Sequence, residues 1–288
     1  MGFVNLKRKS WIRGLEMSEF LSSTNISRVD TQADGSTQLS HVVGPVLTDL
    51  WRLERCVGDV LQNAAQKFPS QEIVYIDDHG EEMSSSYFEL LATAETIAAG
   101  LHKAGFRVGD KLIVQTARSS TTIPLLWACL LSGVVAVPTP ALTVLDEGAA
   151  PVRKLRAVWE MLNGPAIATD ADIADKLAGF GSEHGWDGLR VISFDTLNDA
   201  TAKQHAPALP KLSPDTLAML PLTSGSTGRP KAVELTHRNI LAMSAGTNQA
   251  NGFTVEDVAL NWMPLDHPGA LVFLGVVPMD VGAAQIHV

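Results

Sequence analysis

Residues 221–237 read PLTSGSTGRPKAVELTH, and this stretch decides how the rest of the chain is interpreted. Within it, residues 223–231 hold four hydroxyl residues, two glycines, a proline and a lysine between two apolar runs. Glycines let a backbone approach an anion closely, short hydroxyls add hydrogen-bond donors without bulk, and a lysine adds positive charge. The stretch is therefore either a plain turn or a loop that binds phosphate.

Two common phosphate-binding patterns do not fit the spacing. The pattern G-x-x-x-x-G-K-[ST] requires a glycine directly before the lysine and a hydroxyl after it, but Pro230 precedes Lys231 and Ala232 follows. The dinucleotide pattern G-x-G-x-x-G requires three glycines, and Gly225 and Gly228 have no third partner. Neither of these nucleotide-binding folds is indicated.

Outward from this stretch, apolar strands alternate with segments of helical periodicity. Strands are predicted at residues 72–77, 110–116, 134–138, 164–170, 189–197, 216–222 and 231–237, and helices at 53–69, 86–105, 121–133, 171–180 and 237–250. Strands that are apolar on both faces and separated by helices are typical of a parallel sheet covered by helices. We predict an α/β fold with largely parallel sheets, in which residues 198–214 form a proline-rich connector.

The first part of the chain has a different composition. Residues 18–45 are rich in serine, threonine and small polar residues and show little periodicity, so we expect a flexible N-terminal arm over residues 1–45. Order is expected to begin near residue 53. The loop at 223–231 is expected to be an exposed connection between adjacent strands, less ordered than its flanks.

Composition excludes several classes of function. The 288 residues are 45% hydrophobic and 18% charged, with a net charge of -9, which argues against a nucleic-acid-binding surface. Two distant cysteines, Cys56 and Cys129, are expected to be buried thiols rather than a disulfide or a metal site. No apolar run reaches the roughly 18 residues of a membrane span, and we expect a cytoplasmic protein.

Residues 223–231, TSGSTGRPK, resemble the phosphate-binding motif of the adenylate-forming superfamily, which includes acyl-CoA synthetases, fatty acyl-AMP ligases and peptide-synthetase adenylation domains. Residues 217–240 are similar to the strand, loop, strand and helix around that motif. The stretches 87–114 and 126–140 resemble two upstream blocks, and NWMPLDHPGALVFLG at 261–275 resembles the motif with a histidine beside the acyl pocket. The resemblance covers roughly residues 53–288.

One detail of the histidine motif points to a subfamily. Common acyl-CoA synthetases have an aromatic residue before the histidine, whereas this chain has Asp266 before His267. The form MPLDH, together with WACLLSGVVAVPTP, is more similar to ligases that load acyl chains onto carrier proteins of polyketide or hybrid synthases. A medium or long carboxylic acid is the expected substrate.

The resemblance implies a two-step reaction. A carboxylate attacks the α-phosphorus of ATP, pyrophosphate leaves, and the acyl-AMP is then transferred to a thiol of coenzyme A or of a carrier protein. Catalysis of the first step is mainly positioning and electrostatic stabilisation, with Mg²⁺ as the implied metal. The resemblance assigns the β- and γ-phosphates of ATP to Thr223, Ser224, Gly225, Ser226, Thr227 and Gly228, and charge neutralisation to Lys231.

Alternatives remain open for single residues. Lys231 could instead form a structural salt bridge, and His267, which by resemblance gates the acyl pocket, could be a structural histidine at a strand end. His237 is expected to begin the following helix and is given no chemistry. Asp257 and Asp266 are too far apart in sequence to indicate an acid–base pair.

Family members carry an adenine site, a ribose-binding aspartate, a hinge and a small C-terminal lid domain with a catalytic lysine, and none of these is found here. The resemblance therefore implies a partial N-terminal domain over residues 53–288. Two other hypotheses are kept: a non-catalytic remnant that binds ATP weakly or binds a partner, and a plain α/β domain whose loop binds nothing. A final apolar strand, AAQIHV, is expected to leave apolar surface exposed on at least one face.

Overall fold

A computed structural model describes residues 46–48, 55–142, 144–224 and 230–288. The chain divides into two units, Met1–Thr48 and Asp49–Val288. Within the first unit only residues 46–48 are described, and they form neither a helix nor a strand. The predicted flexible arm over residues 1–45 lies outside the described residues.

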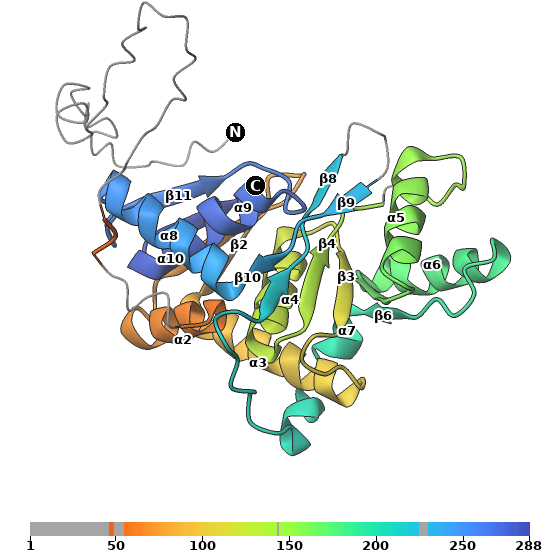
Figure 1. Cartoon of the computed structure of the whole chain (residues 1–288), viewed down its shortest axis with the longest axis horizontal. Helices are drawn as coiled ribbons and strands as arrows, with labels where there is room; N and C mark the ends of the chain where they lie inside the picture. The colour runs from red at the N-terminus through yellow and green to blue at the C-terminus, as the bar shows by residue number, and fades with distance from the viewer. Residues whose placement is uncertain (1–45, 49–54, 143, 225–229) are drawn as a thin grey trace, which may run out of the picture. The chain divides into compact units, whose positions relative to one another are not determined.

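The centre of this unit is a six-stranded sheet in the order β10-β7-β4-β3-β5-β6 (Figure 1). Its strands are β3 (Lys111–Gln115), β4 (Val135–Pro138), β5 (Ala166–Thr169), β6 (Val191–Ser193), β7 (Leu217–Met219) and β10 (Leu235–Thr236). All neighbouring pairs are parallel except β10 and β7, which are antiparallel. The prediction of a largely parallel α/β sheet is confirmed.

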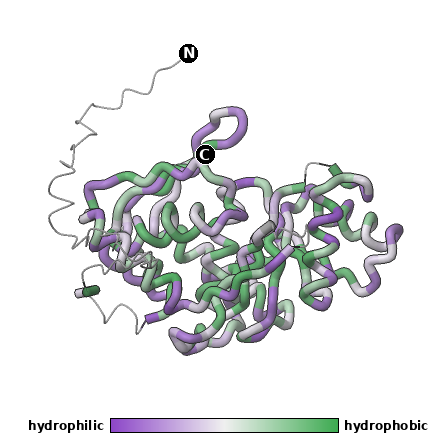
Figure 2. The backbone as a smooth tube through the Cα atoms, turned by 45° about the horizontal axis from the view of Figure 1, so that its top comes forward, coloured by the Kyte–Doolittle hydropathy of each residue, from purple (hydrophilic) through white to green (hydrophobic). Residues whose placement is uncertain are grey.

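Helices cover both faces of this sheet. They are α2 (Val57–Lys67), α3 (Tyr87–Lys103), α4 (Ser119–Ser132), α5 (Ala150–Met161), α6 (Ala171–Glu183), α7 (Phe194–Leu197), the 3₁₀ helix η2 (Ala200–His205) and α8 (His237–Asn251). Successive side chains of β3 alternate between two cores: Leu112 and Val114 join the cluster built on α2, α3 and α4, and Ile113 joins the cluster built on α5 and α6. Figure 2 shows the apolar segments gathered along these strands.

A second sheet has four strands in the order β11-β12-β1-β2, namely β11 (Val258–Asn261), β12 (Ala284–His287), β1 (Glu72–Ile76) and β2 (Glu82–Ser86). Its inner face buries Ile73, Tyr75 and the polar residues of β12. On the opposite face of the edge strand, Leu260 is 52% exposed and Trp262 beyond it is 72% exposed. These exposed apolar residues belong to the edge strand β11, whereas the final strand β12, where the sequence predicts exposed apolar surface, lies between β11 and β1 and is buried or half-buried.

Several elements differ from the sequence prediction. Strand β2 is not predicted, because its residues lack the alternation of a half-buried strand. Helix α5 is not predicted, nor are β11 and the helical stretch formed by α9 (Pro268–Leu271), the π-helical segment η3 (Val272–Val276) and α10 (Val277–Val281). The strand predicted at 231–237 is two short strands in different sheets, β9 (Pro230–Ala232) and β10.

Helix ends follow the capping chemistry of the sequence. Gly133, predicted to close α4, adopts the left-handed conformation with φ of 74°. His237, predicted to begin the helix after the loop, is the first residue of α8, and the Thr236 side chain accepts a hydrogen bond from the backbone N–H of Asn239. Both cysteines are buried and free, as predicted.

Candidate functional site

The glycine- and serine-rich stretch is carried on a hairpin. Strand β8 (Leu222–Ser224) pairs antiparallel with β9, so that Leu222 lies opposite Ala232 and Thr223 lies opposite Lys231. Leu222 and Ala232 pack on the core cluster of α5 and α6, which anchors one face of the hairpin. The other face presents Thr223 and Lys231, and both are exposed. The predicted connection between adjacent strands is therefore present at 222–232.

The remaining predicted phosphate ligands are placed as follows. Gly225, Ser226, Thr227 and Gly228 lie outside the described residues. Ser224 is the last residue of β8, and only its backbone is described. The hairpin thus fixes the two ends of the 225–229 segment on adjacent strands, with Thr223 at one end and Lys231 at the other.

Lys231 is an exposed cation. The structural salt bridge considered as an alternative is not found, since no carboxylate of the described residues lies within ion-pair distance of its ammonium group. A solvated ammonium next to a hydroxyl, on an anchored hairpin, fits an anionic group such as a phosphate. The residues described here therefore fit the triphosphate that the resemblance implies.

The hairpin follows the carboxyl end of β7, one strand of the parallel sheet. In open α/β sheets, ligands bind outside the carboxyl ends of the strands. The polar side chains of Gln115, Thr139 and Thr169 are buried at the carboxyl ends of β3, β4 and β5. The β8–β9 hairpin therefore lies at the carboxyl ends of the strands, where ligand sites of this architecture are found.

His267 lies beyond the carboxyl end of β11 and caps the short helix α9. Its Nδ1 accepts a hydrogen bond of 3.0 Å from the backbone N–H of Gly269. A neutral imidazole that accepts at Nδ1 carries its proton on Nε2, and this N–H has no hydrogen-bond partner among the described residues. His267 is exposed, so the Nε2–H group is available to a ligand. This cap replaces the strand-end position considered from the sequence.

Thr223 and Lys231 come from one segment and His267 from another. Within the described residues, no hydrogen bond or ion pair joins His267 to either of them. The hairpin and α9 both lie in the upper part of Figure 1, beyond strand ends. Asp266 is half-buried and Asp257 accepts a backbone hydrogen bond from Thr254, so these two carboxylates have separate environments.

A buried polar chain supports the segment that carries His267. Asn261 donates from Nδ2 to the carbonyl of Ala270 at 3.3 Å, and its Oδ1 accepts from the backbone N–H of Met263 at 3.2 Å. The same amide lies 3.1 Å from Nδ1 of His287, whose Nε2 lies 3.1 Å from Oε1 of Gln285. Because Gln285 Oε1 can only accept, His287 Nε2 donates to it and Nδ1 accepts from Asn261.

The hydrogen bonds that join Asn261, His287 and Gln285 are not predicted from the sequence. Burial lowers the pKa of His287 to about 4, so the ring is neutral at physiological pH. Gln285 also donates to the hydroxyl of Tyr87 at 3.0 Å, which extends the chain to the first residue of α3. The available signal is the pair of polar residues at alternate positions of an otherwise apolar terminal strand.

His237 is fully buried and its role is structural. Its Nδ1 accepts a hydrogen bond of 3.1 Å from the backbone N–H of Val57, the first residue of α2. Its Nε2 is buried without a hydrogen-bond partner among the described residues. Burial lowers the pKa of His237 to about 4, with Asp59 opposing the shift. The histidine thus connects the first turns of α2 and α8.

In the part of the chain that the structure describes, no group of three or more His, Cys, Asp and Glu residues could hold a metal ion. Mg²⁺ commonly binds through substrate phosphates with only one or two carboxylates, so this finding is compatible with magnesium that accompanies ATP. None of the described helices is both long and apolar enough to cross a membrane.

Comparison with known proteins gives a consistent result. The family model described as AMP-binding enzyme matches residues 61–288. Atromentin synthetase invA1 of Paxillus involutus is 31% identical over 239 residues, which is 80% of this chain and 24% of that protein. The chain therefore spans about a quarter of the length of the curated relatives it matches.

Two solved structures are similar in both fold and sequence. McyG A-PCP complexed with phenylalanyl-adenylate is 40% identical, with a TM-score of 0.77, and the match covers 81% of this chain and 42% of that one. The adenylation domain of a keto acid-selecting NRPS module bound to keto acyl adenylate is 34% identical, with a TM-score of 0.73, and the match covers 81% and 41% of the two chains.

Proposed function

Since the chain belongs to the AMP-binding enzyme family, we propose that it binds the phosphates of ATP on the β8–β9 hairpin while a carboxylic acid is converted to an acyl adenylate. The observation that carries this proposal is the placement of Lys231. Its ammonium group is exposed, has no carboxylate partner among the described residues, and lies across the hairpin from Thr223. Residues 223–228 together with Lys231 would hold the β- and γ-phosphates.

Each part of this arrangement has a distinct task. The hairpin would orient the triphosphate, and Lys231 would offset part of the charge that develops as pyrophosphate leaves. Mg²⁺ bound to the phosphates would neutralise further charge. His267 would lie at the entrance for the carboxylate. It would donate a hydrogen bond to the carboxylate from the free N–H of Nε2.

The substrate is proposed to be a carboxylic acid without a requirement for an α-amino group. The keto acyl adenylate held by one of the solved relatives named above supports α-keto acids as first candidates, whereas the phenylalanyl adenylate held by the other carries an α-amino group and makes an amino acid the alternative that the assay must exclude. The fatty or polyketide-type acids expected from the sequence remain candidates, because the form MPLDH is similar to that of acyl-loading ligases. Exclusive activation of an amino acid would contradict this proposal.

The acceptor of the acyl group is proposed to be a thiol. A carrier-protein phosphopantetheine arm is favoured over coenzyme A, since a relative at 40% identity is described as an A-PCP structure. Mass spectrometry of a carrier protein incubated with the complete enzyme, ATP and acid would detect the acyl group by its added mass. The same reaction with coenzyme A tests the other acceptor.

A second candidate function is a non-catalytic domain that binds ATP weakly or binds a partner. The exposed Thr223 and Lys231 on the β8–β9 hairpin would serve such binding equally well, because contacts to phosphates do not require turnover. The two functions are separated by measuring acid-dependent exchange of labelled pyrophosphate into ATP in the complete protein that contains this chain, with aryl, α-keto, fatty and amino acids in turn. Stimulation by one class of acid supports the enzyme. Binding of ATP without exchange for any acid supports the non-catalytic domain.

A further inference from the structure

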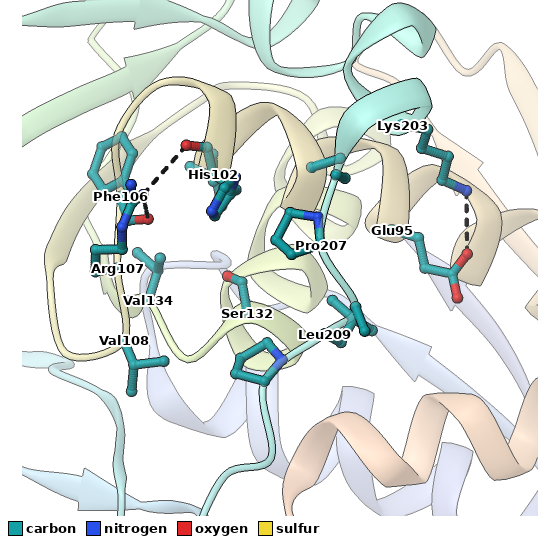
Figure 3. Close-up of a pocket in the computed structure, with 15 residues that line it drawn as sticks. Glu95, His102, Phe106, Arg107, Val108, Ser132, Val134, Lys203, Pro207 and Leu209 are labelled. Atoms are coloured by element: carbon teal, nitrogen blue, oxygen red, sulfur yellow. Dashed lines mark hydrogen bonds and ion pairs between the residues drawn. The ribbon is translucent and has the colours of Figure 1, made fainter.

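A cleft of about 440 Å³ lies between α3 and residues 206–210, a segment that we call the strap (Figure 3). The strap is the middle part of the proline-rich connector predicted at 198–214. It crosses the second half of α3 and continues toward β7. The volume of the cleft falls in the range of roughly 300–1,000 Å³ that is usual for small-molecule sites.

The cleft is separate from the proposed nucleotide site. Phe106, Arg107 and Val108 precede β3, Val134 precedes β4, and the strap precedes β7, so these residues gather at the amino ends of parallel strands. The β8–β9 hairpin follows the carboxyl end of β7. The cleft therefore lies at the amino ends of the parallel strands and the hairpin at their carboxyl ends. The length of the strands, which rise about 3.3 Å per residue, separates the two sites.

The interior of the cleft is apolar and well supported. Ala99, Phe106 and Val134 form its floor and are almost fully buried, whereas Val108 at the rim is 50% exposed. The strap closes the other side with Pro207, Leu209 and Pro210. The lining would bury the apolar body of a small molecule.

Gly133 fixes the wall that carries Val108. A Cβ atom at Gly133 would come within 2.7 Å of a methyl of Leu212 and 3.2 Å of the methyls of Val108, and the φ of Gly133 is +74°. Glycine therefore allows the end of the connector and the segment before β3 to pack closely against the end of α4. The cleft is built by the packed ends of three elements rather than by loose loops.

Lys203 and Arg107 both line the cleft, but within the described residues only Lys203 has a carboxylate partner. Lys203 is neutralised by Glu95, whose carboxylate lies 3.1 Å from its ammonium group, and it also donates to the carbonyl of Ala92 at 3.1 Å. Arg107 has no carboxylate partner for its side chain among the described residues. Its Nη1 donates to the carbonyls of Phe106 at 2.8 Å and His102 at 3.4 Å.

These backbone contacts hold the guanidinium group in place and leave Nε and Nη2 without a partner among the described residues. The Asp110 carboxylate is occupied by the backbone N–H of Arg107 at 2.7 Å and lies outside the lining of the cleft. The ring of His102 also lines the cleft, and it has no hydrogen bond within the part of the chain that the structure describes. A fixed arginine with free donors thus lies next to an apolar cavity, with a histidine on the same rim (Figure 3).

We propose that this cleft is a second ligand site, which binds a small amphipathic carboxylate with its apolar body between α3 and the strap and its anionic group on Arg107. Charge complementarity selects an anion, because the other cation of the lining is already paired. Planar donors of an arginine match a carboxylate in a bidentate arrangement. The site is independent of the proposed adenylation, since it shares no residue with the hairpin or with His267.

The test measures binding of 4-phenylbutanoate and of its uncharged analogue 4-phenylbutan-1-ol to the 288-residue chain by isothermal titration calorimetry. The carboxylate is expected to bind at a site that depends on Arg107, whether or not it also binds beside His267, and to bind there at least about tenfold more tightly than the alcohol. Arg107→Gln is expected to weaken the carboxylate about tenfold and to leave the alcohol unchanged. Ala208→Trp, at an exposed position of the strap that lines the cleft, is expected to weaken both probes.

Two control variants separate this site from others. Arg153→Gln removes a different exposed arginine, which donates to a backbone carbonyl next to α5, and Lys231→Gln removes the cation of the hairpin. Both are expected to bind the carboxylate as the wild type does, and circular dichroism verifies that every variant is folded. Absence of saturable binding at millimolar carboxylate, or unchanged binding in Arg107→Gln, would overturn the proposal. Loss of binding in Lys231→Gln alone would place the carboxylate at the hairpin and would also overturn it.

Discussion

Thr223 and Lys231 are directly opposite residues of the antiparallel β8–β9 pair, and the side chains of both are exposed. Opposite residues of an antiparallel pair have Cβ atoms about 4.5–5.5 Å apart on the same face of the sheet. The hydroxyl of Thr223 and the ammonium group of Lys231 therefore lie side by side, on the two strands that flank residues 225–229. The opposite face of the hairpin is held by Leu222 and Ala232 on the core.

From this pairing we expect Lys231→Gln to weaken binding of ATP by about tenfold, because a hydrogen-bonded charge on a phosphate is removed without a change in the core. Titration with a fluorescent ATP analogue measures the dissociation constant. Lys154→Gln on α5 is the matched control, since Lys154 is also an exposed lysine without an ion pair among the described residues. Equal loss of affinity in both variants would show that only the overall charge matters.

A second prediction concerns the ring of His267. A Cβ atom at residue 269 would come within 3.0 Å of the Nδ1 of His267, so Gly269→Ala is expected to displace the ring and disturb its hydrogen bond. Nitrogen-15 NMR of the imidazole should report the Nε2–H tautomer in the wild type and a mixture of tautomers in the variant. Gly179→Ala on α6 is the control, because a Cβ there meets no atom within 4 Å. An Nδ1–H tautomer in the wild type would contradict the cap geometry.

Two buried histidines predict how stability depends on pH. The pKa values of His237 and His287 are lowered by burial from 6.5 to about 4, so the unfolded chain binds more protons between these values than the folded chain does. We therefore expect the contribution of these two histidines to the free energy of unfolding to be constant above pH 6.5. This contribution should decrease as the pH drops from 6.5 to 4. At pH 5 each histidine should lower the free energy of unfolding by about 2 kcal/mol relative to its value at pH 7.

Urea denaturation of the wild type and of His237→Asn, at pH 7 and pH 5, measures this contribution. The Oδ1 of asparagine can replace Nδ1 as the acceptor for the N–H of Val57, and the side chain does not titrate. The loss of stability between the two pH values should be smaller in the variant by about 2 kcal/mol. His79→Asn changes an exposed histidine and should leave the loss as in the wild type. An equal loss in all three proteins would refute the assignment.

The central sheet is predicted well from the sequence because its strands are strongly apolar. Leu112, Ile113 and Val114 contribute to cores on both faces, which is the pattern that a parallel strand imposes on its side chains. Edge elements are missed where this signal is absent. Strand β2 holds four polar residues and an exposed methionine, and its position depends on pairing with β1, a tertiary contact that local periodicity cannot report.

The candidate site is predicted in part for a similar reason. A motif such as TSGSTGRPK is local, so its residues can be named from the order of amino acids alone. The hydrogen bond between Asn261 and His287 joins residues 26 positions apart on two strands of one sheet, so local sequence does not report it. The free donors of Arg107 likewise depend on the packing of α3 against the strap. Side-chain chemistry that is completed across elements is visible only when the elements are assembled.

The last prediction concerns the activity of residues 1–288 assayed alone. We expect acid-dependent exchange of pyrophosphate into ATP to be far slower than in a chain of the length of the solved relatives, of which this chain corresponds to about 42%. The resemblance assigns only the phosphate contacts and the acyl entrance to these residues, and it assigns the adenine, the ribose and the catalytic lysine to further segments. Orientation of reactants can supply roughly 7–11 kcal/mol of a barrier, and one lost electrostatic contact typically costs about 10²–10³ in rate.

The measurement compares residues 1–288 with the same chain extended to the length of the relatives, over aryl, α-keto and fatty acids. ATP binding that depends on Lys231, without exchange, is the expected result for the 288 residues. Exchange at a rate near that of the extended chain would show that the hairpin and the His267 segment position ATP and the acid without the further contacts.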